Sequence, residues 1–425
     1  MTEKKTIQPD AVLVGMAERG SDLPALERSL DELARLLDTA GSRVFARVTQ
    51  IKDAPEPRTL IGAGKVKEIR ELCEKNEIKL VVFDGELSPA QIRNLEDDLG
   101  GDVDVIDRSM LILDIFALHA VSGEGKLQVE LAQLRYTAPR LVGHGTEMSR
   151  LGGGIGTRGP GESKLETDRR HMKERISSLE RQLEELEENR AVMRAARDRS
   201  GMLKVALVGY TNAGKSTLLN RLTDAGVLAE NKLFATLDPT TRRLDLPSGE
   251  TVLLTDTVGF IRKLPHHLVK AFRSTLDEAK YADILLIVCD ATDPELPEHL
   301  DVTHETLASL GASDKPTLTV FNHCDELPEC PDTGFVAEGD RIFVSALTGA
   351  GIDLLLAKLD EVAASLRRPC RFLFPYTASG KVDLLYRASA VRSVDYLPEG
   401  IAVTASVDRK TEGELASFIV KGDAS

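Results

Sequence analysis

One run of eight residues constrains the fold of this chain more than any other feature. The mostly apolar residues 203–208 are followed by a glycine-containing run that ends in lysine and serine: Gly209, Tyr210, Thr211, Asn212, Ala213, Gly214, Lys215 and Ser216. The spacing G-x-x-x-x-G-K-[S/T] between a strand and a helix is that of a phosphate-binding loop, the P-loop. Its N–H groups hold phosphate oxygens, Lys215 neutralises their charge, and the Ser216 hydroxyl coordinates Mg²⁺. A glycine turn without a ligand would not need lysine and serine at these positions, so we predict a nucleotide site with Mg²⁺ as its cofactor.

Three later motifs follow predicted strands of the same region. They comprise Asp256, Thr257, Val258 and Gly259, then Asn322, His323, Cys324 and Asp325, and finally Ser345, Ala346 and Leu347. The Asp256 carboxylate can hold a water on the metal, and the Gly259 N–H can meet a γ-phosphate. Asp325 can accept two hydrogen bonds from guanine, whereas adenine would leave it buried and unpaired. These motifs indicate a guanine nucleotide.

This series of motifs resembles the translation-factor-related GTPases. The segments GEGKLQVELAQL at 123–134 and GGGIGTRGPGESKLETDRR at 152–170, together with residues 234–238, are similar to the HflX family, and the similarity covers essentially the whole chain. The resemblance implies hydrolysis of GTP to GDP and phosphate and binding to the ribosome, chiefly to the large subunit and its RNA. It also implies that the protein splits or rescues stalled or stressed ribosomes.

The same resemblance assigns individual residues around the γ-phosphate. Thr236 is expected to complete the coordination of Mg²⁺, with Thr241 as its rival, and Lys215, Thr236 and Gly259 are the expected catalytic residues. The residues expected to flank Thr236 on the nucleotide-facing loop are Phe234, Ala235, Leu237 and Asp238. Such loops become ordered with GTP and loosen after hydrolysis.

Two residues depart from common GTPase patterns. His323 stands where most members of the family have lysine in N-K-x-D, a lysine that lays its alkyl stem over the base. An imidazole can stack there instead, so we expect guanine specificity to survive with weaker affinity; a neutral drift position is the alternative. Phe260 stands where many GTPases place the glutamine that orients the attacking water. We therefore predict slow intrinsic hydrolysis that the ribosome accelerates.

Periodicity and composition predict an α/β fold class in four parts. Residues 1–124 read as an α/β domain, 125–200 as a long helical hairpin with a glycine-rich tip loop, 201–368 as a GTPase domain with a mostly parallel sheet flanked by helices, and 369–425 as a small C-terminal α/β domain. Serine capping boxes predict that helices start at Ser88 and Ser163. Strands are expected at residues 11–16, 43–51, 79–83, 102–106, 203–208, 251–255, 284–289, 317–321 and 341–344.

The glycine run at 152–161 contains G-x-G-x-x-G, but it opens a helix and follows no strand, so the context of a dinucleotide site is missing. The second helix of the hairpin carries five Lys or Arg against three acids in residues 163–175, and one Arg against five Glu in 176–189. Such mobile cations suit contact with phosphate groups, whereas a solvated helix is the alternative. The candidate RNA contacts are Arg150, Arg158, Lys164, Arg169 and Arg170.

The net charge of −14 excludes a surface coated with nucleic acid, so any RNA contact is confined to a local patch. Five cysteines without C-x-x-C pairs favour a reducing, cytoplasmic location, and no membrane-spanning segment is visible. The short sequence Gly62-Ala63-Gly64-Lys65 is expected to be a helix-entry turn, with a second nucleotide site as the alternative. His119, His144 and His171 lack metal-ligand spacing.

Two other functions remain open on sequence alone. An ATP-using P-loop enzyme acting on RNA is favoured by residues 62–65 and by His323. A nucleotide-gated scaffold that binds protein partners and hardly hydrolyses is permitted by Phe260.

Overall fold

The structure, a computed structural model, describes residues 9–20, 23–141, 160–198, 202–223, 232–234, 236–263, 273–327, 341–407 and 409–420. These residues group into two compact units. The first falls within residues 1–184, 231–237 and 264–272, and the second within residues 185–230, 238–263 and 273–425. The α/β fold class is confirmed, while the division into four domains with the boundaries given above stays a prediction.

The first unit begins with a sheet of four parallel strands in the order β2-β1-β3-β4. The strands are β1 (Asp10–Glu18), β2 (Arg43–Lys52), β3 (Leu80–Phe83) and β4 (Asp104–Asp107), and the helices between them are α1 (Leu23–Thr39), α2 (Ala63–Asn76) and α3 (Pro89–Leu99). Apolar residues of the central strands, such as Val12 and Val81, are fully buried. The capping box at Ser88 is present, with Pro89 at the first helical position. Helix α2 begins directly after Gly62, whose N–H donates to the Gln50 Oε1 at 2.7 Å, so residues 62–65 form the expected helix-entry turn.

Three further helices follow the sheet: α4 (Arg108–His119), α5 (Gly123–Thr137), which leads into η1 (Ala138–Leu141), and α7 (Pro160–Asp198). Residues of α7 up to 184 group with the first unit and those from 185 with the second. Helix α7 begins at Pro160, so the prediction that Ser163 caps its N-terminus is wrong. Proline suits the first position of a helix because its φ angle is already helical and its missing N–H would have no partner there. Ion pairs join α5 to α7, with Arg175 2.7 Å from Glu130 and Arg135 2.6 Å from Glu180.

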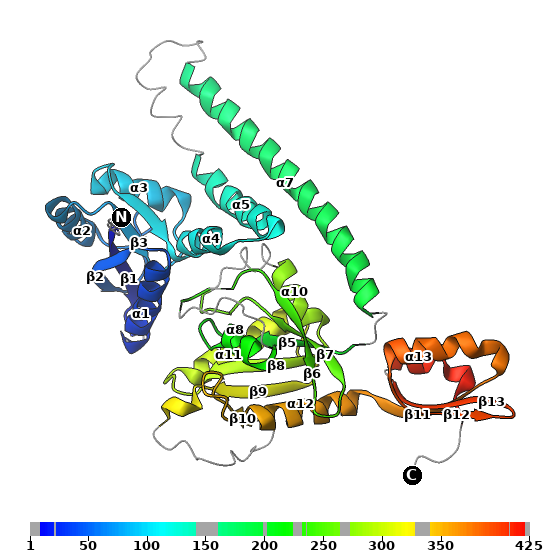
Figure 1. Cartoon of the computed structure of the whole chain (residues 1–425). Coiled ribbons are helices and arrows are strands. Elements are labelled where there is room, and N and C mark those ends of the chain that lie inside the picture. Colours follow the sequence, from blue (N-terminus) through cyan, green and yellow to red (C-terminus); the bar gives the residue numbers. More distant parts are fainter. Residues whose placement is uncertain are drawn as a thin grey trace, which may run out of the picture. The chain divides into compact units, whose positions relative to one another are not determined.

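The second unit contains a six-stranded sheet in the order β10-β9-β8-β5-β7-β6, in which β6 alone is antiparallel to its neighbour. The strands are β5 (Lys204–Val208), β6 (Thr240–Asp245), β7 (Thr251–Asp256), β8 (Ile284–Asp290), β9 (Thr317–Asn322) and β10 (Arg341–Phe343). Helices α8 (Lys215–Thr223), α10 (Arg273–Tyr281), α11 (Leu296–Ser309) and α12 (Ile352–Leu366) accompany this sheet (Figure 1). The buried core is formed by apolar side chains of β5, β7, β8 and β9 and of helices α8 and α12.

The chain continues into a three-stranded antiparallel sheet in the order β11-β13-β12 (Figure 1). Its strands are β11 (Arg368–Phe374), β12 (Ala390–Leu397) and β13 (Gly400–Val407), and its short helices are η3 (Tyr376–Lys381), α13 (Val382–Ala388), α14 (Arg409–Glu414) and η4 (Ala416–Phe418). Pro369 lies within β11, an edge strand, where a residue without an N–H is tolerated. Among the helices that the structure describes, none combines the length and the apolar composition that crossing a bilayer requires.

Candidate nucleotide site

The predicted P-loop and two of the later motifs begin at the carboxyl ends of parallel strands of one sheet. The P-loop leaves β5, Asp256 ends β7, and Asn322 ends β9. Loops at this edge of an open α/β sheet form the crevice in which such folds bind ligands. The order of the strands therefore gathers motifs that are more than a hundred residues apart in the sequence.

Two glycines of the P-loop have no room for a side chain. A Cβ on Gly209 would lie 2.1 Å from the Val288 carbonyl oxygen, and a Cβ on Gly214 would lie 2.1 Å from Asn322 Nδ2. Both residues also have positive φ, 140° and 86°, which glycine adopts without steric cost. The loop thus packs tightly against strand ends β8 and β9, and its N–H groups are positioned by that packing.

Lys215 is the first residue of α8, and its side chain is buried under the P-loop. Its ammonium donates hydrogen bonds to the carbonyl oxygens of Tyr210 at 2.7 Å and of Gly209 at 3.2 Å. Burial lowers the pKa of Lys215 to about 8, although the nearby Asp256 carboxylate favours the charged form. Because burial disfavours the charge of the Lys215 ammonium, a negatively charged phosphate group beside it would stabilise that charge.

Ser216 and Asp256 form the part of the site suited to a metal ion. The Ser216 hydroxyl donates to Asp256 Oδ2 at 2.6 Å, and Asp256 is completely buried. Hydroxyl and carboxylate oxygens are the ligands that Mg²⁺ prefers, usually together with waters and substrate phosphates. These two side chains therefore fit the magnesium ion that the motif implies.

The segment after β7 lies directly on the P-loop. The Phe260 N–H donates to the Gly209 carbonyl at 3.0 Å, and the Thr211 N–H donates to the Phe260 carbonyl at 2.8 Å. A Cβ on Gly259 would lie 2.7 Å from the Thr211 Cα and 2.9 Å from the Lys215 Nζ, so only glycine fits there. Thr257 is buried and donates to the Leu207 carbonyl at 2.7 Å.

The phenyl ring of Phe260 is 1% exposed and belongs to the buried core. An apolar ring has no group that could orient a water, and its burial removes it from the solvent. The structure thus agrees with the simpler explanation that Phe260 packs in the core, which leaves the positioning of the attacking water to another group.

Tyr210 has contacts that its place inside the motif did not predict. Its ring stacks on that of His299 of α11, with centroids 3.6 Å apart, and its hydroxyl accepts a hydrogen bond of 2.8 Å from the Arg262 N–H. Arg262 in turn pairs with Glu295 at 3.0 Å, and His299 Nδ1 lies 3.1 Å from Asp293. This cluster ties the P-loop to α11 and to the segment after Phe260, and no sequence pattern links these residues.

Asn322 joins the P-loop to the loop after β10. Its amide donates to the Ala213 carbonyl at 3.1 Å, and its carbonyl oxygen accepts from the Ala346 N–H at 2.9 Å. Ser345 and Cys324 are fully buried, whereas Asp325 and Leu347 are exposed. An exposed Asp325 carboxylate beside this junction is accessible to a base.

His323 pairs with Asp290, which ends β8: the distance from His323 Nδ1 to Asp290 Oδ2 is 3.0 Å. The hydrogen bond to Asp290 raises the pKa of His323 above its ordinary value. Burial opposes the charge on Asp290, but hydrogen bonds from His323 and Thr292 outweigh this effect and lower the pKa of Asp290. The sequence showed that His323 stands where lysine is usual, but it gave no indication that His323 would pair with the Asp290 carboxylate.

The segment expected to carry the switch threonine groups with the first unit. Phe234 is buried with φ 57°, and its ring meets that of Phe116 of α4 edge to face at 4.7 Å. Leu237 is buried, Thr236 and Asp238 are partly buried, and Ala235 lies outside the described residues. Thr241 lies on β6, where its hydroxyl is 2.9 Å from that of Thr255. Because Thr236 belongs to the first unit and Ser216 to the second, their joint coordination of a metal stays a prediction.

The candidate RNA contacts are only partly described. Arg169 and Arg170 are exposed on α7, and Arg170 Nε lies 3.8 Å from a carboxylate oxygen of Glu174. Lys164 lies on the same helix, and Arg150 and Arg158 lie outside the described residues.

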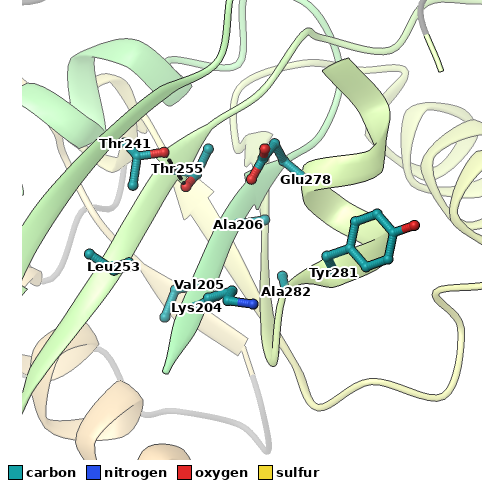
Figure 2. Close-up of a pocket in the computed structure, with 9 residues that line it drawn as sticks. All are labelled: Lys204, Val205, Ala206, Thr241, Leu253, Thr255, Glu278, Tyr281 and Ala282. Atoms are coloured by element: carbon teal, nitrogen blue, oxygen red, sulfur yellow. Dashed lines mark hydrogen bonds between the residues drawn. The ribbon is translucent and has the colours of Figure 1, made fainter. Parts of the chain in front are cut away.

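A separate hollow lies in the second unit, between β5, β6, β7 and α10. Figure 2 shows its nine lining residues, among them Ala206, Leu253 and Ala282 as well as Thr241 and Thr255, which are joined by the hydrogen bond given above. Its volume is about 20 Å³, enough for about one water. It is too small for a nucleotide, and none of its lining residues belongs to the P-loop. Within the part of the chain that the structure describes, no cluster of His, Cys, Asp or Glu with metal-binding geometry is found.

Three family models match consecutive parts of the chain. They are described as "GTP-binding GTPase N-terminal" for residues 27–117, "GTP-binding GTPase Middle Region" for residues 119–197, and "50S ribosome-binding GTPase" for residues 204–323. The last of these covers the P-loop and ends at His323.

Curated relatives match along most of their length. The chain is 48% identical over 416 residues to the GTPase HflX of Lacrimispora saccharolytica, covering 98% of this chain and 97% of the relative. It is 48% identical over 336 residues to the GTPase HflX of Escherichia coli K12, covering 78% of each chain. Among solved structures, that of a GTP-binding protein from Sulfolobus solfataricus in complex with GDP covers 84% of this chain and 100% of that one, at 27% identity and a TM-score of 0.45.

Proposed function

Since this chain belongs to the HflX family of GTPases, we propose that it binds GTP at the carboxyl edge of the β5–β10 sheet and hydrolyses it to GDP and phosphate. We propose further that it acts in the cytoplasm on ribosomes, chiefly on the large subunit and its RNA. The observation that carries the nucleotide site is the convergence of Lys215, the Ser216–Asp256 pair and Asn322 around one loop.

We assign each residue of this site a chemical task. Lys215, whose ammonium is held at the P-loop, neutralises charge on the phosphates, and the Gly259 N–H donates to the γ-phosphate. Ser216 would hold Mg²⁺ directly and Asp256 would hold it through a water, with Thr236 as the proposed further ligand. The metal, when bound, draws negative charge from the phosphate oxygens. Asp325 accepts hydrogen bonds from the guanine base.

Hydrolysis by the protein alone is expected to be slow. Phe260 is buried and cannot orient water, so either another residue or a bound partner must position it, and we propose that the ribosome does so. GTP turnover by the purified full chain is measured with and without large ribosomal subunits. Turnover that is at least about tenfold faster with subunits is expected, corresponding to about 1.4 kcal/mol of barrier. Equal rates contradict this proposal.

Attachment to the ribosome is supported by the family model described as a "50S ribosome-binding GTPase", which matches residues 204–323. Contact with RNA through α7 is supported by the basic start of that helix. Arg169 and Arg170 are exposed there and can contact phosphate groups. We propose that the nucleotide state controls this contact and that the protein splits or rescues stalled or stressed ribosomes by means of it.

Sedimentation with separated ribosomal subunits tests this proposal, with GDP or a non-hydrolysable GTP analogue present. We expect association with the large subunit that depends on the analogue. Arg169→Glu combined with Arg170→Glu is expected to weaken it, whereas Arg181→Glu, an exposed site in the acidic part of α7, serves as the matched control. Association that is the same with GDP and with the analogue favours the scaffold. In a separate binding experiment with fluorescent GDP and fluorescent ADP, equal affinity for the two nucleotides favours an ATP-using enzyme.

A further inference from the structure

His323 lies between the P-loop and Asp325. It follows the last residue of β9 and precedes the short helix η2 (Cys324–Glu326), with φ 63° in the left-handed region. A Cβ on Gly214 would lie 3.4 Å from His323 Nε2, so one edge of the imidazole faces the P-loop. The ring is therefore placed where a nucleotide passes from its phosphates to its base.

Asp290 holds the opposite edge of the ring. Its Oδ2 lies 3.0 Å from His323 Nδ1, and its Oδ1 accepts hydrogen bonds from the Thr292 N–H at 2.9 Å and the Thr292 hydroxyl at 2.7 Å. The His323 side chain is 28% exposed and that of Asp290 is 26% exposed. The imidazole is thus fixed at one edge and still accessible to a ligand.

The charged groups that face His323 are mostly negative. They are Asp290 from β8 and, from η2, Asp325 and Glu326. Lys215 begins α8, next to Gly214, but its ammonium donates to the Tyr210 and Gly209 carbonyls. Three carboxylates around one imidazole favour its protonated form, in line with the raised pKa of His323.

We propose that His323, protonated and held by Asp290, forms the face against which the guanine base lies in place of the family's lysine, so that guanine-nucleotide affinity falls as His323 loses its proton. This inference rests on the proposed nucleotide site. A planar cation offers a purine both a stacking surface and an electrostatic attraction, and the neutral ring keeps only the first. Losing the electrostatic attraction should weaken guanine-nucleotide affinity about two- to fivefold, which is the contribution of a partly exposed cation–π contact.

Equilibrium binding of fluorescent GDP to the full chain between about pH 6 and pH 8.5 tests the proposal, because histidine titrates in that range. The wild type is compared with His323→Lys, which stays charged, and His323→Gln, which is never charged. His304→Gln, at an exposed histidine of α11, is the matched control. Ionisation of the nucleotide itself is common to all four proteins and cancels in the comparison.

We expect Kd to rise about two- to fivefold more over this range in the wild type and in His304→Gln than in the two His323 variants. In Asp290→Asn the rise in Kd should occur at lower pH than in the wild type, because the variant lacks the carboxylate that stabilises the proton on His323. Parallel pH profiles for wild type, His323→Lys and His323→Gln would overturn the inference. Failure of the wild type to bind GDP at any pH would instead overturn the nucleotide site itself, and circular dichroism identifies a variant that has not folded.

Discussion

The hydroxyl of Ser216 donates a hydrogen bond of 2.6 Å to the buried carboxylate of Asp256, a residue forty positions later in the chain. Ser216 lies in the first turn of α8 and Asp256 is the last residue of β7. Because β5, which leads into the P-loop, pairs with β7 in parallel, the two side chains meet at one edge of the sheet. This pair of oxygen ligands is the basis of the predicted magnesium site.

Replacing Ser216 with Ala should weaken nucleotide binding only when magnesium is present. The variant removes a hydroxyl ligand, and loss of a bond to a charged group costs about 1.5–3 kcal/mol, or about a ten- to hundredfold rise in Kd. Fluorescent GDP binding is measured with Mg²⁺ and again with a chelator. Thr217→Ala, next in the chain, is the control. Equal losses in both buffers would show that Ser216 does not act through the metal.

Lys215→Met should stabilise the nucleotide-free protein while abolishing stabilisation by GDP. The pKa of Lys215 is lowered to about 8 by burial, so folding disfavours its charge. The unfolded chain binds the proton more tightly, and the contribution of this lysine to stability therefore rises with pH between about 8 and 10.5. The variant lacks this pH dependence, and we expect its Tm at neutral pH to exceed that of wild type by about 2 °C or more. A lower Tm without nucleotide contradicts this account of the buried charge.

Phe260→Gln should lower stability without accelerating intrinsic GTP hydrolysis. The ring is buried, so the polar replacement loses packing and leaves an amide in the core, at a cost of about 3 kcal/mol. Phe260→Leu, which keeps an apolar side chain, is the matched control and should retain most of the stability. Thermal unfolding and single-turnover hydrolysis are measured on both variants. Faster hydrolysis by Phe260→Gln would mean that this position faces the γ-phosphate.

Asp325→Asn should shift binding from guanine toward xanthine nucleotides. In the proposed site the exposed carboxylate would accept from two N–H donors of guanine, whereas an amide would present a donor to the second carbonyl of xanthine. Competition of GDP and XDP for the site measures the shift, and Glu326→Gln on the same short helix is the control. If the variant prefers GDP as strongly as the wild type, Asp325 does not read the base.

The strands and helices that sequence patterns predicted are mostly those in which burial follows a simple period. Helix α1 buries Leu26, Leu30, Leu33 and Leu37, at helical spacing, and β5 is a continuous buried run. Helix α4 and strand β6 are among the elements that were not predicted individually, because neither has such a period. Helix α4 is apolar on nearly every side and so has no amphipathic period, and β6 is a largely polar strand without alternation.

The sequence by itself determined the nucleotide motifs and the family, because a P-loop is a local pattern in which glycines, lysine and serine must stand at set intervals. Tertiary structure alone decided which side chains meet around that loop. The His323–Asp290 pair, the stacking of Tyr210 on His299 and the burial of Phe260 join residues from different elements. Such contacts depend on strand order and on packing over many residues, and neither produces a recognisable pattern in the amino-acid sequence.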